Sequence, residues 1–237
     1  MSEASLESKL IAEGIGVFAL TFIGAGSIIM GGDLMTVALA HGIVLSIVVT
    51  ATMNVSGGHI NPAVTISMMA VKKMDNETGM KYIVAQLVGG LIAGGALFAL
   101  VGHSGFDFAG LDAGLGTPAP GAGLGWGGVI MIEFFLTFLL LFAIWGTAVD
   151  PRAPAIGGWG IGMMVAVDIM MGGPLTGAAM NPARYLGTAA FAGKSFLMDS
   201  WMYIIGTVAG AMACSFLYNN MIMAPEDDEA KLEDHDA

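Results

Sequence analysis

The tripeptide Asn-Pro-Ala occurs twice in this chain, and each copy has a glutamate at the same distance before it. Glu13 precedes the first copy and Glu133 precedes the second, in both cases 48 residues before the asparagine. A tripeptide repeated by chance would not keep this spacing. The chain is therefore predicted to consist of two related halves. The two copies are Asn61, Pro62, Ala63 and Asn181, Pro182, Ala183.

The composition places both halves in a membrane. Hydrophobic residues make up 56% of the chain and charged residues 11%, whereas soluble domains are about 25% charged. A helix needs about 20 mostly apolar residues to cross the bilayer core, and six stretches meet this requirement. The predicted spans are Leu10–Met30, Leu34–Val55, Tyr82–Val101, Val129–Val149, Ile156–Gly173 and Trp201–Met223.

The expected fold is an all-α membrane protein with six transmembrane helices and two half-helices. Three spans in each half turn the second half upside down relative to the first, which makes an inverted repeat with its functional site near the midplane. The apolar runs 61–71 and 181–191 are too short to span and are the predicted half-helices. The other predicted segments are an N-terminus (1–8), a first repeat (9–102), an outer connecting loop (103–126), a second repeat (127–223) and an acidic tail (224–237).

The basic residues predict the orientation of the chain. If six spans alternate from an inside N-terminus, the lysines and arginines of the loops fall on one side, with Lys194 as the exception. The positive-inside rule makes this side the cytoplasm, so both termini are expected there. Much of the net charge of −11 lies in the tail, which we interpret as solvated, with a regulatory or partner-binding tail as the alternative. No basic patch points to nucleic acid as a partner.

Each Asn-Pro-Ala copy has the chemistry of a helix start. Asparagine is a preferred N-cap, and proline favours the first helical position, where its missing N–H costs nothing. In an inverted repeat two such starts meet at the bilayer centre. Each carries roughly half a positive charge, so the pair forms a barrier to cations. The amides of Asn61 and Asn181 can then donate hydrogen bonds to a passing neutral molecule.

These residues resemble the aquaporins, or major intrinsic proteins. The similarity runs from about Glu13 to Gly210 and rests on the segments around both tripeptides, together with Ala85-Gln86 and Asp150-Pro151. The resemblance implies one pore per chain, usually in a homotetramer within the lipid bilayer. It also implies passive transport driven by gradients, and no enzymatic activity. Nothing in the sequence indicates a cofactor or a metal site.

The resemblance further implies a selectivity filter near the outer mouth. Arg184 lies three residues after the second asparagine, where the first repeat has Val64, and a buried arginine in a membrane is by default a functional residue. The other three filter positions carry over to His41, Ile169 and Ala178. This set is similar to that of plant tonoplast-type members. Because Ile169 and Ala178 widen and partly dehydrate the filter, we expect passage of water and ammonia, with urea and hydrogen peroxide as further candidates.

Two other transport functions are less consistent with the sequence. Glycerol facilitators are expected to have a Trp/Phe pair in the filter, where this chain has His41 and Ala178. An ion-coupled secondary transporter would need acidic residues beside the broken helices at the midplane, where this chain has Asn, Ala and Val. A passive channel for water and small neutral solutes is therefore the favoured function.

Four further residues are candidates for roles around the pore. The resemblance implies that Glu13 and Glu133 hold the half-helix loops by accepting backbone N–H bonds, which agrees with the cost of an unpaired buried carboxylate; a proton relay is the alternative. His59 is interpreted as a loop-packing residue that supports the half-helix, with a pH gate as the alternative. Our hypothesis for Asp168 is a hydrogen bond that fixes His41 or Arg184, although helix geometry also allows it to face a neighbouring helix.

Overall fold

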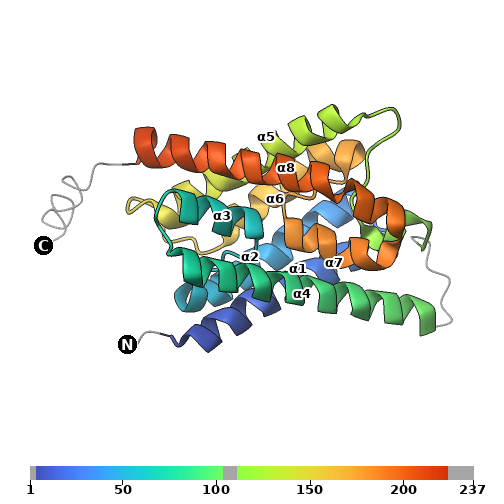
Figure 1. The fold of residues 1–237 in the computed structure, drawn as a ribbon, viewed down its shortest axis with the longest axis horizontal. Coiled ribbons are helices and arrows are strands. Elements are labelled where there is room, and N and C mark those ends of the chain that lie inside the picture. The colour runs from blue at the N-terminus through green and yellow to red at the C-terminus, as the bar shows by residue number, and fades with distance from the viewer. Residues whose placement is uncertain (1–3, 104–110, 224–237) are drawn as a thin grey trace, which may run out of the picture.

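The chain folds into a bundle of long helices that run roughly along one axis, with two short helices enclosed between them (Figure 1). The computed structural model describes residues 4–103 and 111–223. Within these residues, six helices are long and apolar enough to cross a membrane, as predicted. They are α1 (Leu6–Ile29), α2 (Leu34–Ser56), α4 (Asn76–His103), α5 (Trp126–Ile144), α6 (Trp159–Thr176) and α8 (Lys194–Leu217).

Several helix ends differ from the predicted spans. Helix α4 begins at Asn76 rather than Tyr82, and α8 begins at Lys194 rather than Trp201, because hydropathy does not detect a polar first turn. Helix α6 continues past Gly173 to Thr176 and contains Pro174. A proline removes one backbone donor from a helix, and in α6 this happens only within the last turn, so the helix ends soon afterwards without a break at Gly173.

The two short helices begin at the duplicated tripeptides. Helix α3 covers Pro62–Ala70 and α7 covers Pro182–Ala192, each with its asparagine as N-cap. They lie toward opposite ends of the bundle axis in Figure 1, and hydrogen bonds join the loops at their N-termini. The predicted half-helices, 61–71 and 181–191, are therefore correct to within one residue at each end.

Glycines allow the long helices to pack with their backbones in contact. A Cβ on Gly42 of α2 would overlap the carbonyl oxygen of Gly162 of α6, and a Cβ on Gly162 would overlap the carbonyl oxygen of Gly42. A side chain at either position would push the two helices apart. Helices in lipid associate through such small-residue faces, because no hydrophobic driving force acts between them.

The segment that connects the two halves packs onto the bundle. A single 3-10 helix, η1 (Leu111–Gly116), precedes an extended stretch in which the Gly121 N–H donates to the Leu175 carbonyl at 2.7 Å. Leu115 is buried against Ala25, Ile29 and Leu97. The glycine and proline content of the outer connecting loop does not indicate that its described part, from residue 111 on, packs against α1 and α6.

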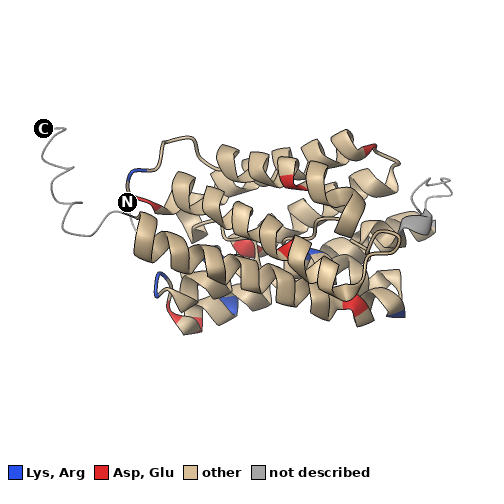
Figure 2. Cartoon of the chain, turned by 90° about the horizontal axis from the view of Figure 1, so that it is seen from above, with Lys and Arg blue, Asp and Glu red and all other residues tan. Residues whose placement is uncertain are grey.

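The two ends of the bundle differ in charge. Helix α1 begins and α8 ends at the same end of the axis (Figure 1). Figure 2 shows the Lys and Arg positions concentrated at this end, with few exceptions, and several acidic positions inside the bundle. The predicted acidic tail lies outside the described residues.

An ion pair between buried Asp150 and half-exposed Arg152 ties together the charged ends of α5 and α8. Each helix closes with a π-helical turn, η2 (Trp145–Val149) after α5 and η3 (Tyr218–Ile222) after α8. Asp150 is buried and accepts two hydrogen bonds from the Arg152 guanidinium, at 2.9 and 2.6 Å. Tyr218 also donates to Asp150, and Arg152 donates to the Ile222 carbonyl. The hydrogen bonds to Arg152 hold the pKa of Asp150 at about 2, below its ordinary value of 3.8.

This ion pair predicts a pH-dependent stability. Because the folded pKa is depressed, the stabilisation is complete above about pH 4 and is lost as the pH falls through about 2. We expect Asp150→Asn to lower the melting temperature in detergent by roughly 2–4 °C at pH 6, and the difference from wild type to vanish near pH 2. Glu77→Gln, which breaks an exposed pair with Lys81, should leave the melting temperature unchanged. A constant difference across the pH range would contradict this assignment.

Candidate functional site

Two buried glutamates hold the loops that precede the half-helices. Glu13 accepts hydrogen bonds from the Ser56 hydroxyl and from the backbone N–H groups of His59 and Ile60, at 2.7, 2.9 and 2.5 Å. Glu133 accepts the equivalent three from the Thr176 hydroxyl and from the N–H groups of Ala179 and Met180, at 2.7, 2.9 and 2.9 Å. The sequence separations, 43, 46 and 47 residues, are identical in the two halves. Both carboxylates are fully buried, as the proposed anchoring role requires.

The two loops also share an unusual backbone conformation. Ile60 and its repeat counterpart Met180 both have positive φ angles, 53° and 49°, which are uncommon for residues with a side chain. Gly58 and its counterpart Ala178 have φ angles of 62° and 48°. The glutamates hold both loops in this strained form, which keeps the asparagines at the helix starts.

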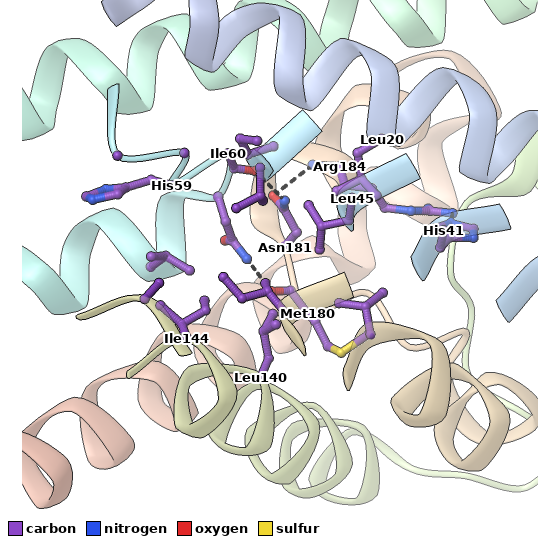
Figure 3. A pocket seen from close by; sticks show the side chains of 18 of the residues that line it. Leu20, His41, Leu45, His59, Ile60, Leu140, Ile144, Met180, Asn181 and Arg184 are labelled. Carbon is purple, nitrogen blue, oxygen red and sulfur yellow. Dashed lines mark hydrogen bonds between the residues drawn. The ribbon is translucent and has the colours of Figure 1, made fainter. Parts of the chain in front are cut away.

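The two asparagines join the halves at the centre of the molecule. The Asn61 amide nitrogen donates to the Met180 carbonyl, and the Asn181 amide nitrogen donates to the Ile60 carbonyl, both at 2.8 Å (Figure 3). Each Oδ1 caps its own helix by accepting from the N–H of Ala63 or Ala183. An amide nitrogen has two N–H groups, so one N–H of each asparagine remains available to a molecule in the cavity.

A cavity of about 340 Å³ runs past both asparagines. His59 lies toward one end of it, and His41 and Arg184 lie toward the other, with Asn181 between them (Figure 3). All four predicted filter residues, His41, Ile169, Ala178 and Arg184, line this cavity. Most of its remaining wall is apolar, with side chains that include Leu20, Leu45, Val49, Leu140, Ile144 and Val165.

His41 and Arg184 are hydrogen-bonded to each other at the end of the cavity. The Arg184 guanidinium Nη2 lies 3.2 Å from His41 Nε2, and His41 Nδ1 lies 2.8 Å from the Val37 carbonyl oxygen. A carbonyl only accepts and a guanidinium only donates, so this geometry assigns a neutral ring with its proton on Nδ1. Arg184 Nη1 is buried and has no hydrogen-bond partner among the described residues.

His59 supports the first half-helix and also lines the cavity. Its ring Nδ1 lies 3.1 Å from the Thr65 hydroxyl of α3, and its ring packs edge-on against Tyr82 of α4. These contacts fit the loop-packing interpretation. The position of His59 at the cavity wall keeps the pH-gate alternative as a hypothesis.

The predicted hydrogen bond from Asp168 to the filter is absent. Within the described residues, no hydrogen bond joins Asp168 to His41 or Arg184, whose ring and guanidinium contacts are those given above. Asp168 is buried, and its Oδ2 has no hydrogen-bond partner in the part of the chain that the structure describes. Ile169 faces the cavity, and the rotation of about 100° per residue in a helix turns Asp168 away from it.

Sequence reasoning missed several residues that complete this site. Ser56 and Thr176 each bond a glutamate, and the hydroxyls of Tyr82 and Tyr203 donate to the carbonyls of Ser56 and Thr176, at 2.9 and 2.8 Å. The sequence contained a signal for these residues. Ser56 and Thr176, and likewise Tyr82 and Tyr203, are separated by nearly the same number of residues as the two tripeptides. In the first half only, Gln86 adds a hydrogen bond to Glu13.

The position of Ala178 predicts a reagent-dependent block. Ala178 lines the cavity, whereas Cys214, the chain's single cysteine, is fully buried. Because thiols bind soft metals, a mercurial should reduce water flux through Ala178→Cys at least about two-fold, and excess thiol should reverse the block. The wild type should be insensitive in the same light-scattering assay. Equal inhibition of both proteins would place the reactive thiol at Cys214 and contradict the assignment.

Comparisons with known proteins agree with this architecture. The family model described as "Major intrinsic protein" matches residues 1–218. The chain is 38% identical over 237 residues to Aquaporin TIP4-4 from Zea mays, covering 94% of this chain and 90% of the relative. It is 37% identical to Aquaporin AqpM from Methanothermobacter thermautotrophicus, covering 90% and 97%. An X-ray structure of the aquaglyceroporin from Plasmodium falciparum has a similar fold, with a TM-score of 0.77 and 23% identity over 92% of this chain and 97% of that chain.

Proposed function

The chain belongs to the major intrinsic protein family of membrane channels, and we propose that within this family it conducts water together with ammonia while excluding protons and ions. A channel for water and small solutes follows from the family itself. The finer proposal concerns the solute range, with urea and hydrogen peroxide as further candidates. It assigns the chain no enzymatic activity.

The composition of the filter is the observation that carries this proposal. His41 and Arg184 supply polar groups on one part of the wall, and Ile169 and Ala178 supply apolar surface on another. A small neutral hydrogen-bonding molecule can replace its lost water contacts at the asparagine amides. A cation would meet the Arg184 charge and the positive ends of two helices, so its entry is strongly disfavoured.

The carboxylates of the bundle support a passive channel over an ion-coupled transporter. Among the described residues that line the cavity there is no Asp or Glu. Glu13 and Glu133 are instead committed to the half-helix loops, where every oxygen accepts at least one hydrogen bond. These bonds also argue against a proton relay, because moving either carboxylate would leave buried N–H groups unpaired.

The orientation and the assembly of the chain are also proposals. The basic residues concentrated at the end where α1 begins (Figure 2) support a cytoplasmic location for both termini. A homotetramer is proposed from the family, and the large apolar side chains exposed on the outside of the bundle are compatible with lipid or with neighbouring copies. Native mass spectrometry in detergent would measure the number of chains.

Stopped-flow experiments on proteoliposomes test the solute range. Light scattering after an osmotic step would measure water and urea, and an internal pH dye would measure ammonia entry. We expect water and ammonia permeabilities at least about ten-fold above those of empty liposomes, which corresponds to a barrier lowered by 1.4 kcal/mol. Fast water flux without ammonia entry would contradict our interpretation of the filter. Fast glycerol flux would instead support a facilitator of the glycerol type.

A further inference from the structure

Gly24 of α1 lies directly against the ring of His41. A methyl group built on Gly24 would overlap ring atoms Nε2, Cδ2 and Cε1 of His41. Gly24 is buried, as is His41. The imidazole therefore occupies the space that a side chain at position 24 would need.

The ring has little freedom to move out of this space. Its Nδ1 is bonded to the Val37 carbonyl one turn earlier in α2, and its Nε2 is bonded to Arg184 of α7. Helix α1 closes a third side at Gly24. A group added to Gly24 requires a shift of the ring or of α1, and a shift of the ring stretches at least one of its two hydrogen bonds.

The two repeats differ at this pair of positions. The offset that relates Glu13 to Glu133 and Asn61 to Asn181 relates Gly24 to Ile144 and His41 to Ile161. Ile144 and Ile161 both line the cavity in the second repeat. The small residue thus occurs only in the half whose partner position carries the filter histidine.

We propose that Gly24 is a positioning residue that holds the filter residue His41 in place. The absence of a side chain lets the imidazole lie against α1, which keeps Nε2 within hydrogen-bonding distance of Arg184 and sets the width of the filter. This inference rests on the proposed filter and adds a residue that determines the position of one filter side chain. Gly24 itself need not contact the permeating molecule.

Gly26→Ala in the same helix provides a matched control. A Cβ at Gly26 would meet only Leu97 Cδ2, at an ordinary 3.7 Å. Water permeability in proteoliposomes would be compared for wild type, Gly24→Ala, Gly26→Ala, His41→Ala and the double variant Gly24→Ala/His41→Ala. We expect Gly24→Ala to lower water permeability at least about three-fold, because the added methyl overpacks the site, and Gly26→Ala to match wild type.

The double variant distinguishes positioning from general damage. With the imidazole removed, the added methyl has room, so the double variant should match His41→Ala in water permeability and in melting temperature. This non-additivity is the expected signature of a contact between the two positions, and it applies even if Gly24→Ala alone fails to fold. An equal loss in both backgrounds, or Gly24→Ala behaving as Gly26→Ala does, would overturn the proposal. A wild type without ammonia flux would contradict the proposed solute range and would leave this water comparison intact.

Discussion

Replacement of Arg184 by valine should convert the channel into one that leaks cations. Valine is the residue at the equivalent position, Val64, of the first repeat, so the change makes the two halves alike. A unit charge 4 Å from a permeating cation contributes about 4 kcal/mol at an effective dielectric constant of 20. We therefore expect proton and ammonium conductance to rise roughly 1,000-fold, while water permeability stays within about two-fold of wild type. Liposome-flux assays with a pH dye and a membrane-potential clamp would measure both.

Arg184→Lys separates charge from hydrogen bonding at the same position. Lysine keeps the positive charge but lacks the planar fork that bonds His41 through Nη2. It should therefore retain most of the cation exclusion and alter the ratio of ammonia to water flux. If Arg184→Val excluded protons as well as the wild type does, the two helix N-termini alone would supply the barrier to cations. The role assigned to Arg184 would then be wrong.

Replacement of Glu133 by leucine should destabilise the protein and disorder the loop that precedes α7. The change leaves the N–H groups of Ala179 and Met180 and the hydroxyl of Thr176 without their acceptor. Each of these three unsatisfied buried groups costs about 1–3 kcal/mol, so a loss of roughly 3–9 kcal/mol is expected. This is a large part of the stability of an ordinary domain. Melting in detergent and water flux in proteoliposomes would both report the loss.

Milder changes provide the controls for this prediction. Glu133→Gln keeps one acceptor oxygen, so its cost should be smaller, about 1–2 kcal/mol. Ser56→Ala removes one donor to Glu13 and the acceptor of the Gly58 N–H, so it should cost about 1–3 kcal/mol. A Glu133→Leu protein that melts and conducts water like the wild type would show that the loop conformation does not depend on the carboxylate.

The fold was largely readable from the sequence because two strong signals agreed. Apolar stretches of membrane-spanning length and a duplicated tripeptide with its glutamate together predict six spans and two half-helices. The helix ends were less predictable. Asn76 and Lys194 lie in helices beyond the apolar stretches, because a helix can extend into the polar interface where hydropathy no longer detects it.

Only part of the candidate site could be predicted from the sequence. The filter residues His41, Ile169, Ala178 and Arg184 line one cavity, as the resemblance implied, but the functions assigned to them remain proposals. Asp168 does not form its predicted hydrogen bond. The sequence shows that Asp168 is adjacent to the filter residue Ile169. It does not show which residues Asp168 contacts, because these depend on the direction in which its side chain leaves α6.

The sequence by itself determined the class of the protein, because length, hydropathy and spacing are properties of the chain. It specified a membrane bundle, its internal repeat and the two helix starts that meet at the centre. The tertiary structure decided the contacts between segments far apart in the chain. These are the donors that converge on Glu13 and Glu133, the crossed bonds of Asn61 and Asn181, and the fit of His41 against Gly24. Such contacts depend on the separation and rotation of packed helices, which local sequence patterns do not encode.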